Sequence, residues 1–198
     1  MNTFERVIKR VFDFTLALIS LIFFSPLIAL IALLIKWEDS KGDVIYRQER
    51  IGYKGKPFTL YKFRSMRMDA EAGNRPQLFT DGDSRLTKVG AFIRAHHLDE
   101  FPQLWNVIKG EMSFVGPRPE RQFFIDQIME HNPDYVRLYA LRPGLFSYAT
   151  LYNGYTDTME KMLERLRLDL EYLDNYSLWF DVKIIFLTAF SIIFGKKF

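Results

Sequence analysis

The sequence has 198 residues, of which 48% are apolar and 26% charged, and this balance excludes disorder as the general state of the chain. It contains no cysteine, which excludes disulfides, thiolate catalysis and cysteine-based zinc sites. The formal net charge is +3 and its basic excess lies in residues 41–121, so an anionic partner is expected to bind there.

The first predicted element is a long apolar segment. Phe14 to Ile35 contains no charged residue, and as a helix it is long enough to cross a bilayer core of roughly 30 Å. An amphipathic lead-in, Phe4–Phe12, precedes it, and Asp13 is expected at the depth of the lipid headgroups. A secretory signal would have a shorter apolar core and a small-residue cleavage site, so the segment is interpreted as a retained membrane element.

Ser25-Pro26 lies almost at the centre of this segment. Proline removes a helix hydrogen bond and kinks or breaks the helix, and a serine hydroxyl can bond a carbonyl that the break sets free. Two arms of about ten residues would each reach about 15 Å, enough to enter one leaflet and return. The residues alone leave two alternatives open, a kinked spanning helix and a re-entrant hairpin.

After the apolar segment, Val44–Arg50 and Phe58–Met66 are predicted to be short strands joined by a turn that contains glycine and proline. Period-two geometry places Lys62 and Arg64 on one face of the second strand. Cations on one strand face suit a polyanion, nucleic acid included, although a solvated strand face is the plainer alternative.

The rest of the chain is predicted to be mainly helical, after a polar loop over Asp69–Arg85. Three helices are expected over Lys88–His96, from about Asp99 onward, and over Phe123–His131. The apolar residues from Met159 to Leu173 follow a helical spacing typical of core packing. Ile184–Phe194 is uncharged but too short to span a membrane, so it is either an interfacial helix or a core helix.

Asp99 and Glu100 are adjacent carboxylates, which are usually a solvated or helix-capping pair. If Asp99 caps a helix, the helix dipole favours its ionised form. An ionised carboxylate can act as a nucleophile that forms an acyl phosphate, or it can hold Mg²⁺ together with substrate phosphates. Neighbouring histidines cannot readily share one metal when helical, so His96 and His97 are expected to have polar or interfacial roles.

Gly116-Pro117-Arg118-Pro119 forms a second candidate site. Each proline sets its own φ, and Pro119 biases Arg118 toward an extended conformation. An arginine on so rigid a backbone can bind a phosphate through two hydrogen bonds at low entropic cost. The alternative is a loop with an exposed arginine.

Taken together, these segments resemble the bacterial sugar transferase family, the monotopic phosphoglycosyl transferases that act on polyprenol phosphate. The resemblance covers nearly the whole chain, and the length is similar to that of the smaller members, which lack an additional transmembrane bundle. The matching blocks are Tyr46–Gly52, Phe58–Arg67 with KFRSM at its centre, Asp83–Gly90, Ile93–Arg94, Leu98–Glu120 (LDEFPQLWNVIKGEMSFVGPRPE) and Arg142–Leu145.

The resemblance implies an α+β fold in two parts. Residues 1–40 would form the amphipathic lead-in and a re-entrant membrane hairpin, broken at Ser25 and Pro26 and entered from the cytoplasmic face of the bacterial inner membrane. Residues 41–198 would form a small cytosolic catalytic body of helices and short strands, with amphipathic helices at the membrane interface. The implied partners are a UDP-sugar, polyprenol phosphate and the lipid bilayer, without nucleic acid; the aromatic excess leaves room for a homodimer.

The implied reaction is transfer of a sugar 1-phosphate from the UDP-sugar to polyprenol (undecaprenyl) phosphate, which gives a polyprenyl-diphosphate-sugar and UMP. This is the first membrane step in making an exopolysaccharide, capsule, O-antigen or glycoprotein glycan. The family's mechanism is ping-pong, with Asp99 as the nucleophile that carries the phosphosugar. Glu100 would complete the dyad as proton acceptor or metal ligand, and Mg²⁺, held by Asp99 and Glu100, is the implied cofactor. Cations around the diphosphate would stabilise its charge, and the candidates are Lys62, Arg64, Arg94, Arg118 and Arg142.

One segment departs from the family pattern. After Arg142–Leu145 many relatives continue with a Thr-Gly-Trp-Ala-Gln-Val type sequence, whereas this chain has Phe146–Tyr155. That segment is a hypothetical determinant of sugar specificity. Two competing hypotheses are a non-enzymatic membrane module whose basic middle third binds anionic lipid or nucleic acid, and an enzyme whose apolar segment truly spans the bilayer.

Overall fold

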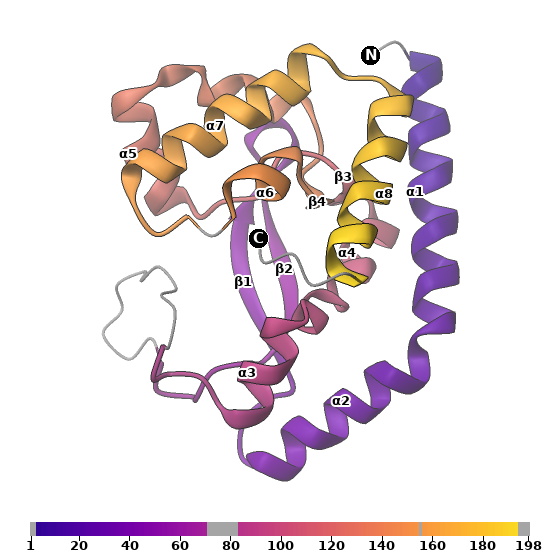
Figure 1. The fold of residues 1–198 in the computed structure, drawn as a ribbon, viewed down its shortest axis with the longest axis vertical. Helices are drawn as coiled ribbons and strands as arrows, with labels where there is room; N and C mark the ends of the chain where they lie inside the picture. The colour runs from indigo at the N-terminus through magenta and orange to yellow at the C-terminus, as the bar shows by residue number, and fades with distance from the viewer. Residues whose placement is uncertain (1–2, 71–82, 155, 194–198) are drawn as a thin grey trace.

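The computed structural model describes residues 3–70, 83–154 and 156–193, which form a mostly helical fold with two small sheets (Figure 1). The predicted α+β class is confirmed. The elements are α1 (Thr3–Phe23), α2 (Ser25–Glu38), β1 (Ile45–Ile51), η1 (Tyr53–Gly55), β2 (Pro57–Phe63), α3 (Lys88–Ala95), η2 (Leu98–Glu100), α4 (Gln103–Lys109), β3 (Ser113–Val115), α5 (Gln122–His131), η3 (Pro133–Ala140), β4 (Gly144–Phe146), α6 (Tyr148–Asn153), α7 (Met159–Asp174) and α8 (Leu178–Ile193).

Two pairs of strands form the sheets. β1 and β2 are antiparallel, with Ile45 opposite Phe63, which confirms the predicted strand pair with ends shifted by a few residues. β3 and β4 are parallel, with Ser113 opposite Gly144. A Cβ at Gly144 would lie 2.2 Å from the backbone nitrogen of Gly116, so glycine is required where these two segments touch.

α1 is docked on the body through polar side chains along one face. Lys9 donates to Asp181 of α8 at 2.5 Å, and Arg10 donates to two carbonyls near the end of α4. Asp13 accepts from the backbone N–H of Phe114 at 3.0 Å and is only 2% exposed. Asp13 is buried because a backbone donor needs this acceptor, and its expected depth at the lipid headgroups stays a prediction. The division into residues 1–40 and 41–198 stays a prediction.

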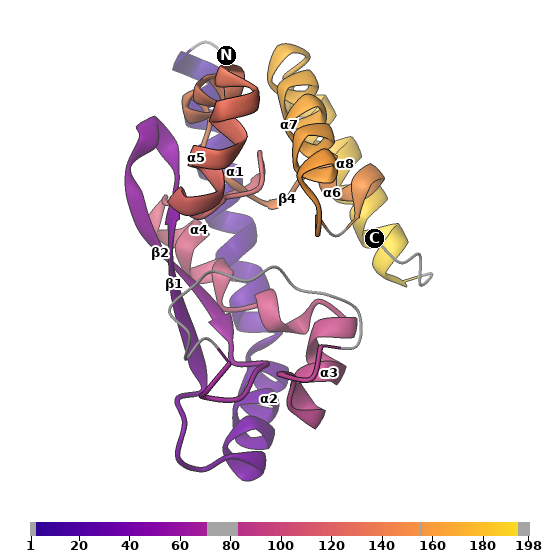
Figure 2. The same cartoon turned by 90° about the vertical axis from the view of Figure 1, so that its left-hand side faces the viewer.

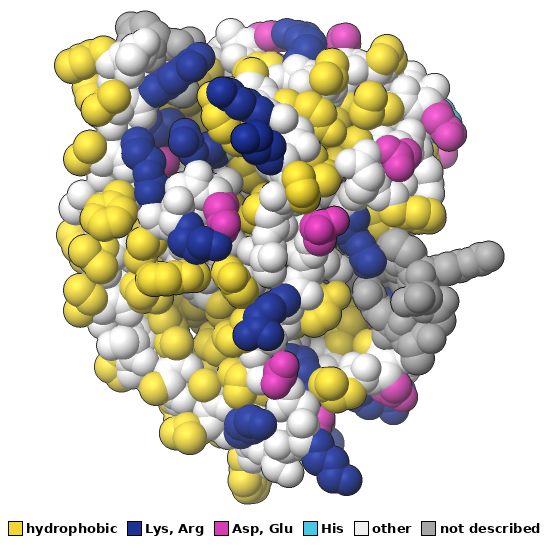
Figure 3. Space-filling view, turned by 180° about the vertical axis from the view of Figure 1, so that it is seen from behind, with side chains coloured by type: hydrophobic (Ala, Val, Ile, Leu, Met, Phe, Trp, Pro, Cys, Tyr) yellow, Lys and Arg dark blue, Asp and Glu magenta, His cyan; other side chains and the backbone are white. Residues whose placement is uncertain are grey.

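The opposite face of α1 is apolar and exposed. Seen from behind, hydrophobic side chains gather along the edge that α1 and α2 form (Figure 3). They include Phe4, Val7, Val11, Phe14, Leu18, Ile22 and Phe23. α8 is joined to α1 by the ion pair between Lys9 and Asp181, and it has the same two-sided character, since Ile184 is fully buried while Trp179 and Phe186 are exposed. The core alternative thus holds for the buried face of α8, and the interfacial alternative stays a prediction; Phe194 lies outside the described residues.

The N-terminal apolar segment is broken at Ser25-Pro26, as predicted. α1 and α2 meet at an angle of 62°, and the Ser25 hydroxyl donates to the carbonyl of Ile22 at 2.7 Å. Within the described residues, no unbroken helix is long and apolar enough to cross a membrane. Among the same residues, α1 and α2 taken together are the one bent pair with that length and apolar character.

The helices of the body confirm most of the predicted pattern. α3 and α5 lie where they were expected, but α4 starts at Gln103 with Pro102 as its cap. Asp99 instead lies in the short turn η2, so the idea that it caps a helix is wrong. The expected loop Asp69–Arg85 falls largely on residues 71–82, outside the described residues.

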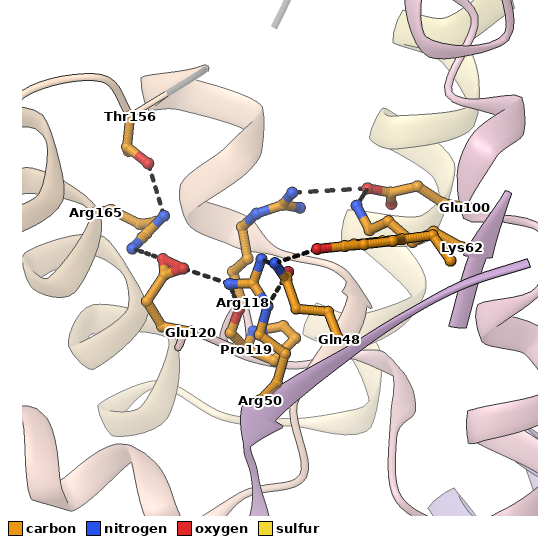
Figure 4. A network of polar contacts seen from close by, with 10 residues as sticks. Gln48, Arg50, Lys62, Glu100, Arg118, Pro119, Glu120, Thr156 and Arg165 are labelled. Carbon is orange, nitrogen blue, oxygen red and sulfur yellow. Dashed lines mark hydrogen bonds and ion pairs between the residues drawn. The ribbon is translucent and has the colours of Figure 1, made fainter. Parts of the chain in front are cut away.

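α7 carries the expected apolar stripe, but it also buries polar side chains. Leu166 is in the core, as the spacing predicted. Arg165 is buried and reaches Glu120 in the loop that contains Arg118 (Figure 4). Asp169 is buried as well and accepts from the backbone N–H of Arg118. α7 is therefore both a core helix and a support for the site described next.

Candidate active site

Asp99 and Glu100 lie in the short turn between α3 and α4. His97 has φ 55°, a left-handed conformation that turns the chain out of α3 just before the dyad. Asp99 is 4% exposed, whereas Glu100 is partly accessible. Phe101, the next residue, packs on the ring of Phe24 at 5.0 Å between centroids. This ring contact connects the turn that carries the dyad, Asp99 and Glu100, to the bend between α1 and α2.

Two cations converge on Glu100 from different segments. Lys62 of β2 donates to Glu100 Oε1 at 2.9 Å, and a guanidinium nitrogen of Arg118 lies 3.6 Å from the same oxygen (Figure 4). A third cation, Arg94 at the end of α3, is close enough to lower the pKa of Asp99. Three of the five predicted cations, Lys62, Arg94 and Arg118, therefore surround the dyad.

The two carboxylates differ in acidity. Burial raises the pKa of Asp99 above its ordinary value, an effect that Lys62 opposes and the neighbouring charge of Glu100 reinforces. Burial would also raise the pKa of Glu100, but Lys62 and Arg118 outweigh it and hold that pKa at about 2. Asp99 is thus the deeper and more readily protonated member, and Glu100 is the fixed negative charge.

Two predicted cations are engaged elsewhere. Arg64 donates to the carboxylate of Asp39 at 2.8 Å and is buried at the end of α2. Arg142 donates to the carbonyl of Gly110 at 2.8 Å and stacks over the ring of Tyr53. Strand alternation suggested that Arg64 would share a face with Lys62, but β2 ends at Phe63. Substrate binding by Arg64 and Arg142 stays a prediction that these contacts do not favour.

Glu120 is a functional neighbour that sequence reasoning did not assign. It is buried and accepts from Arg50 at 2.5 Å and from Arg165 at 2.6 Å (Figure 4). Arg50 also donates to the carbonyl of Pro119, and Arg165 donates to Thr156. Glu120 is the last residue of the family-like block Leu98–Glu120, which also contains Arg118. Its membership of that block is the sequence feature that could have marked it as part of the site.

The backbone of Arg118 is held from a second direction. Its N–H donates to Asp169 Oδ2 at 3.4 Å, and the hydroxyl of Ser147 donates to Asp169 Oδ1 at 2.9 Å. Burial raises the pKa of Asp169 to about 7, against the opposing charge of Arg165. The unusual segment that begins at Phe146 therefore supports the arginine loop; its last residue, Tyr155, lies outside the described residues.

The dyad can be tested for its fit to Mg²⁺. Among the described residues, no group of three or more His, Cys, Asp or Glu could hold a metal alone. Mg²⁺ is usually bound by one or two carboxylates together with substrate phosphates. Asp99 and Glu100 meet that requirement, so they fit a metal shared with a diphosphate but not an all-protein metal cage.

Comparison with known proteins gives a consistent result. The sequence model described as bacterial sugar transferase matches residues 4–195. The chain is 43% identical over 189 residues to the UDP-glucose:undecaprenyl-phosphate glucose-1-phosphate transferase of Escherichia coli (strain K12), covering 94% of this chain and 40% of that protein. It is 42% identical over 188 residues to the UDP-N-acetylgalactosamine-undecaprenyl-phosphate N-acetylgalactosaminephosphotransferase of Aeromonas hydrophila, covering 95% of this chain and 44% of that protein.

A third relative is closer in length. The chain is 37% identical over 195 residues to the exopolysaccharide production protein PSS of Rhizobium leguminosarum bv. phaseoli, covering 94% of this chain and 96% of that protein. The chain therefore spans about two fifths of the first two relatives and nearly all of the third.

Proposed function

The chain belongs to the bacterial sugar transferase family, and we propose that it transfers a sugar 1-phosphate from a UDP-sugar to undecaprenyl phosphate. The observation that carries the proposal is the dyad, a buried aspartate next to a glutamate on which two cations converge. The names of the relatives specify this type of reaction with UDP-glucose and UDP-N-acetylgalactosamine. Such a step would begin the synthesis of a surface polysaccharide.

In the first half of the proposed reaction, a carboxylate oxygen of Asp99 attacks the β-phosphorus of the UDP-sugar. The bond from that phosphorus to the oxygen bridging the two phosphates breaks, and UMP leaves with this oxygen and its electron pair. The product is a phosphosugar joined to Asp99 as an acyl phosphate. Lys62 and Arg94 favour the ionised nucleophile, because both oppose the effect of burial on the pKa of Asp99.

In the second half, a phosphate oxygen of undecaprenyl phosphate attacks the phosphorus on Asp99. The bond between phosphorus and the aspartate oxygen breaks, which regenerates the carboxylate and gives undecaprenyl-diphosphate-sugar. Glu100 is placed to hold cations in both halves, since Lys62 and Arg118 both contact its Oε1. These cations stabilise the charge that spreads over the phosphoryl oxygens in the transition state.

Mg²⁺ is the proposed cofactor, with Asp99 and Glu100 as its protein ligands. When bound, it would neutralise negative charge on the diphosphate so that a carboxylate can approach it. Lys62 and Arg118, which both contact Glu100, would help to orient the phosphates. Arg118 is suited to this because its backbone is fixed by neighbouring prolines and by Asp169.

We place the bent pair α1–α2 in a membrane as a re-entrant hairpin, entered from the cytoplasmic face of the bacterial inner membrane. The 62° bend, the exposed apolar side chains of α1 and the apolar exposed face of α8 support this placement. Because the chain has no cysteine, a cysteine placed at Thr3 can be labelled from either side of the membrane. Labelling from the periplasmic side alone would contradict the hairpin.

UMP release from a panel of UDP-sugars, with Mg²⁺ and undecaprenyl phosphate, tests the activity. We expect Asp99→Asn to lose at least about 1,000-fold in turnover, because the amide cannot form the covalent intermediate. Asp83→Asn is the control, since Asp83 is likewise a shielded aspartate but forms its ion pair with Arg85, outside the dyad. If Asp99→Asn keeps full turnover, Asp99 is not the nucleophile, and if no UDP-sugar releases UMP, the proposed function is wrong.

A further inference from the structure

The bend between α1 and α2 faces the segment that joins α3 to α4, on the inner side of the bent helix pair (Figures 1 and 2). Two aromatic rings make the contact, Phe24 at the bend and Phe101 in that segment, and their centroids are 5.0 Å apart. Phe101 directly follows Glu100 in the chain. The bend therefore touches the residue next to the dyad.

The dyad turn, residues 98–101, has only long hydrogen bonds at its two ends. The N–H of Phe101 donates to the carbonyl of Leu98 at 3.3 Å, and the N–H of Glu100 donates to the carbonyl of His97 at 3.4 Å. Both distances exceed the range of about 2.7–3.2 Å that is usual for such bonds. His97 also has a left-handed backbone with φ 55°, which is costly for a residue other than glycine. The dyad turn therefore depends on the packing of its ends.

Both ends of the dyad turn are apolar and packed. Leu98 packs against a buried cluster to which α2, α3 and β2 contribute, and Phe101 packs against this cluster and against the main core. The cluster consists of Ile31, Ile35, Phe63 and Ile93. Asp99 and Glu100 are thus the middle residues of a turn that is anchored at both ends, and the second anchor is the one in contact with the bend.

The bend supports the ring of Phe24 on a well-bonded backbone. The N–H and the carbonyl of Phe24 both make helical hydrogen bonds of 2.9 Å. The Ser25 hydroxyl donates to the carbonyl of Ile22, which Pro26 leaves without its helical donor because proline has no N–H. Phe24 is partly buried, whereas its neighbour Phe23 is 74% exposed. Phe24 is therefore the ring that the bend directs at the dyad turn.

We propose that Phe24 is a positioning residue for the transfer reaction, which holds the dyad turn through Phe101 so that Asp99 is aligned with the β-phosphorus. This inference rests on the proposed function and adds to it a role of the bend in the chemical step. Phe24 acts through Phe101 and not on the reacting atoms. Because a misplacement of about 1 Å can cost roughly 100-fold in rate, a small shift of the dyad turn is enough to slow the transfer.

The order of the dyad turn is measured first, without turnover. Hydrogen–deuterium exchange of the full chain in phosphatidylcholine nanodiscs reports on the backbone amides of residues 98–104. Phe24→Ala should raise their exchange rate about tenfold or more and leave β1 and β2 unchanged, because only the support of the turn is lost. Phe23→Ala removes an equal ring from the same bend and is the matched control, with unchanged exchange. Unchanged exchange of residues 98–104 in Phe24→Ala, or a rise spread over the whole chain, would overturn the proposal.

Kinetics then test whether the dyad turn sets the rate. Phe24→Ala should lower kcat for UMP release about 10- to 100-fold and leave the KM for the UDP-sugar within about twofold, because Lys62 and Arg118 lie on other segments. Phe24→Tyr keeps the ring and should recover most of the kcat, and Phe23→Ala should be near normal. A normal kcat in Phe24→Ala, even with a lower melting temperature, would contradict the proposal, as would an equal loss in Phe23→Ala.

A double variant tests the path through Phe101. Phe101→Leu keeps an apolar side chain between the two packed regions, so the fold should be retained. Combined with Phe24→Ala, it should lower kcat no further than the larger of the two single losses, because both variants break the same contact. Losses that multiply would show that the two rings act independently and would contradict the proposal.

The exchange and kinetic measurements separate this inference from the proposed function. If the chain releases no UMP from any UDP-sugar while Phe24→Ala raises exchange at residues 98–104, the reaction is wrong and the support of the dyad turn stands. If Phe24→Ala releases UMP at the normal rate, the reaction stands and the positioning role fails.

Discussion

Glu100 and Glu120 each lie between two cations, yet their surroundings differ. Glu100 meets Lys62 and Arg118 in an open cluster, where the side chain of Arg118 is 34% exposed. Glu120 meets Arg50 and Arg165 in a closed cluster, where the Arg165 side chain is only 6% exposed. In both cases burial would raise the pKa of the glutamate, but the cations lower it to about 2. Charge alone therefore does not distinguish the carboxylate proposed to be catalytic from the structural one.

Access to solvent distinguishes them. The cations of the open cluster can exchange a carboxylate for a phosphate, because both are within reach of a ligand. The cations of the closed cluster have no such freedom, and they hold the carbonyl of Pro119 and the side chain of Thr156 as well. Arg118 joins the two clusters, since its side chain reaches Glu100 while Glu120, two residues later, anchors the same loop. The closed cluster thus positions a residue of the open one.

The largest expected effect is on stability, in the closed cluster. Glu120→Ala leaves two buried guanidinium groups without their partner, so the free energy of unfolding should fall by about 3–5 kcal/mol. Denaturation in detergent micelles measures it. Glu164→Ala removes an exposed partner of Arg167 and should change stability by less than about 0.5 kcal/mol. Equal losses in the two variants would mean that the closed cluster is not an anchor.

In the open cluster the expected effect is on activity. Glu100→Gln should lower kcat/KM for UMP release by about 100-fold or more, because it removes the negative charge that holds Lys62 and Arg118 in place. The melting temperature should stay close to that of the original protein, since this cluster is accessible to water. Glu120→Gln should show the reverse pattern, with a lower melting temperature. A large loss of stability in Glu100→Gln would erase the distinction between the clusters.

Features with a local cause were predictable from sequence. The break at Ser25-Pro26 follows from proline itself, and Arg118 was noticed because two prolines restrict its backbone. Lys62 followed from strand alternation, whereas the same rule failed for Arg64, which lies beyond the end of β2. The alternation of side chains along a strand therefore predicts orientation only for residues within that strand.

Buried polar partners were not predictable, because each depends on a segment far away in the chain. Asp13 meets a backbone donor 101 residues later, and Glu120 meets Arg165 45 residues later. On α7, the apolar spacing predicted burial of the leucines only. Arg165 and Asp169 are buried as well. A pattern of single residues carries no information on such pairs.

Arg118→Lys tests the link between the two clusters. Lysine keeps the charge but cannot offer two parallel hydrogen bonds to a phosphate, so kcat/KM should fall by about 10- to 30-fold. The melting temperature should change little, because Asp169 holds the backbone N–H of Arg118 and lysine keeps the positive charge of the side chain. Arg121→Lys, the same exchange three residues after Arg118, is the control and should retain near-normal kinetics. A loss of stability in Arg118→Lys would mean that its side chain belongs to the closed cluster.

Asp169 provides the smallest and most specific test, because it is a buried carboxyl that is not fully matched by a cation. Burial raises its pKa from 3.8 to about 7, with Arg165, Ser147 and Arg118 opposing the shift. A folded-state pKa above the ordinary value means that its stabilising contribution is complete at acidic pH and is lost as pH rises through about 7. From about pH 6 to about pH 8 the loss should be about 1 kcal/mol, or roughly 2–4 °C in melting temperature.

Asp169→Asn should be nearly free of this pH dependence, because asparagine stays neutral and still offers an oxygen to the hydroxyl of Ser147. Asp174→Asn, an exposed aspartate on the same helix, should melt with the same pH dependence as the original protein. If Asp169→Asn retains the full decrease between about pH 6 and about pH 8, Asp169 is ionised in the folded protein throughout that range. The region that supports Arg118 would then contain two ionised, buried carboxylates, Asp169 and Glu120. Both would differ from Glu100 of the open cluster in being closed to solvent.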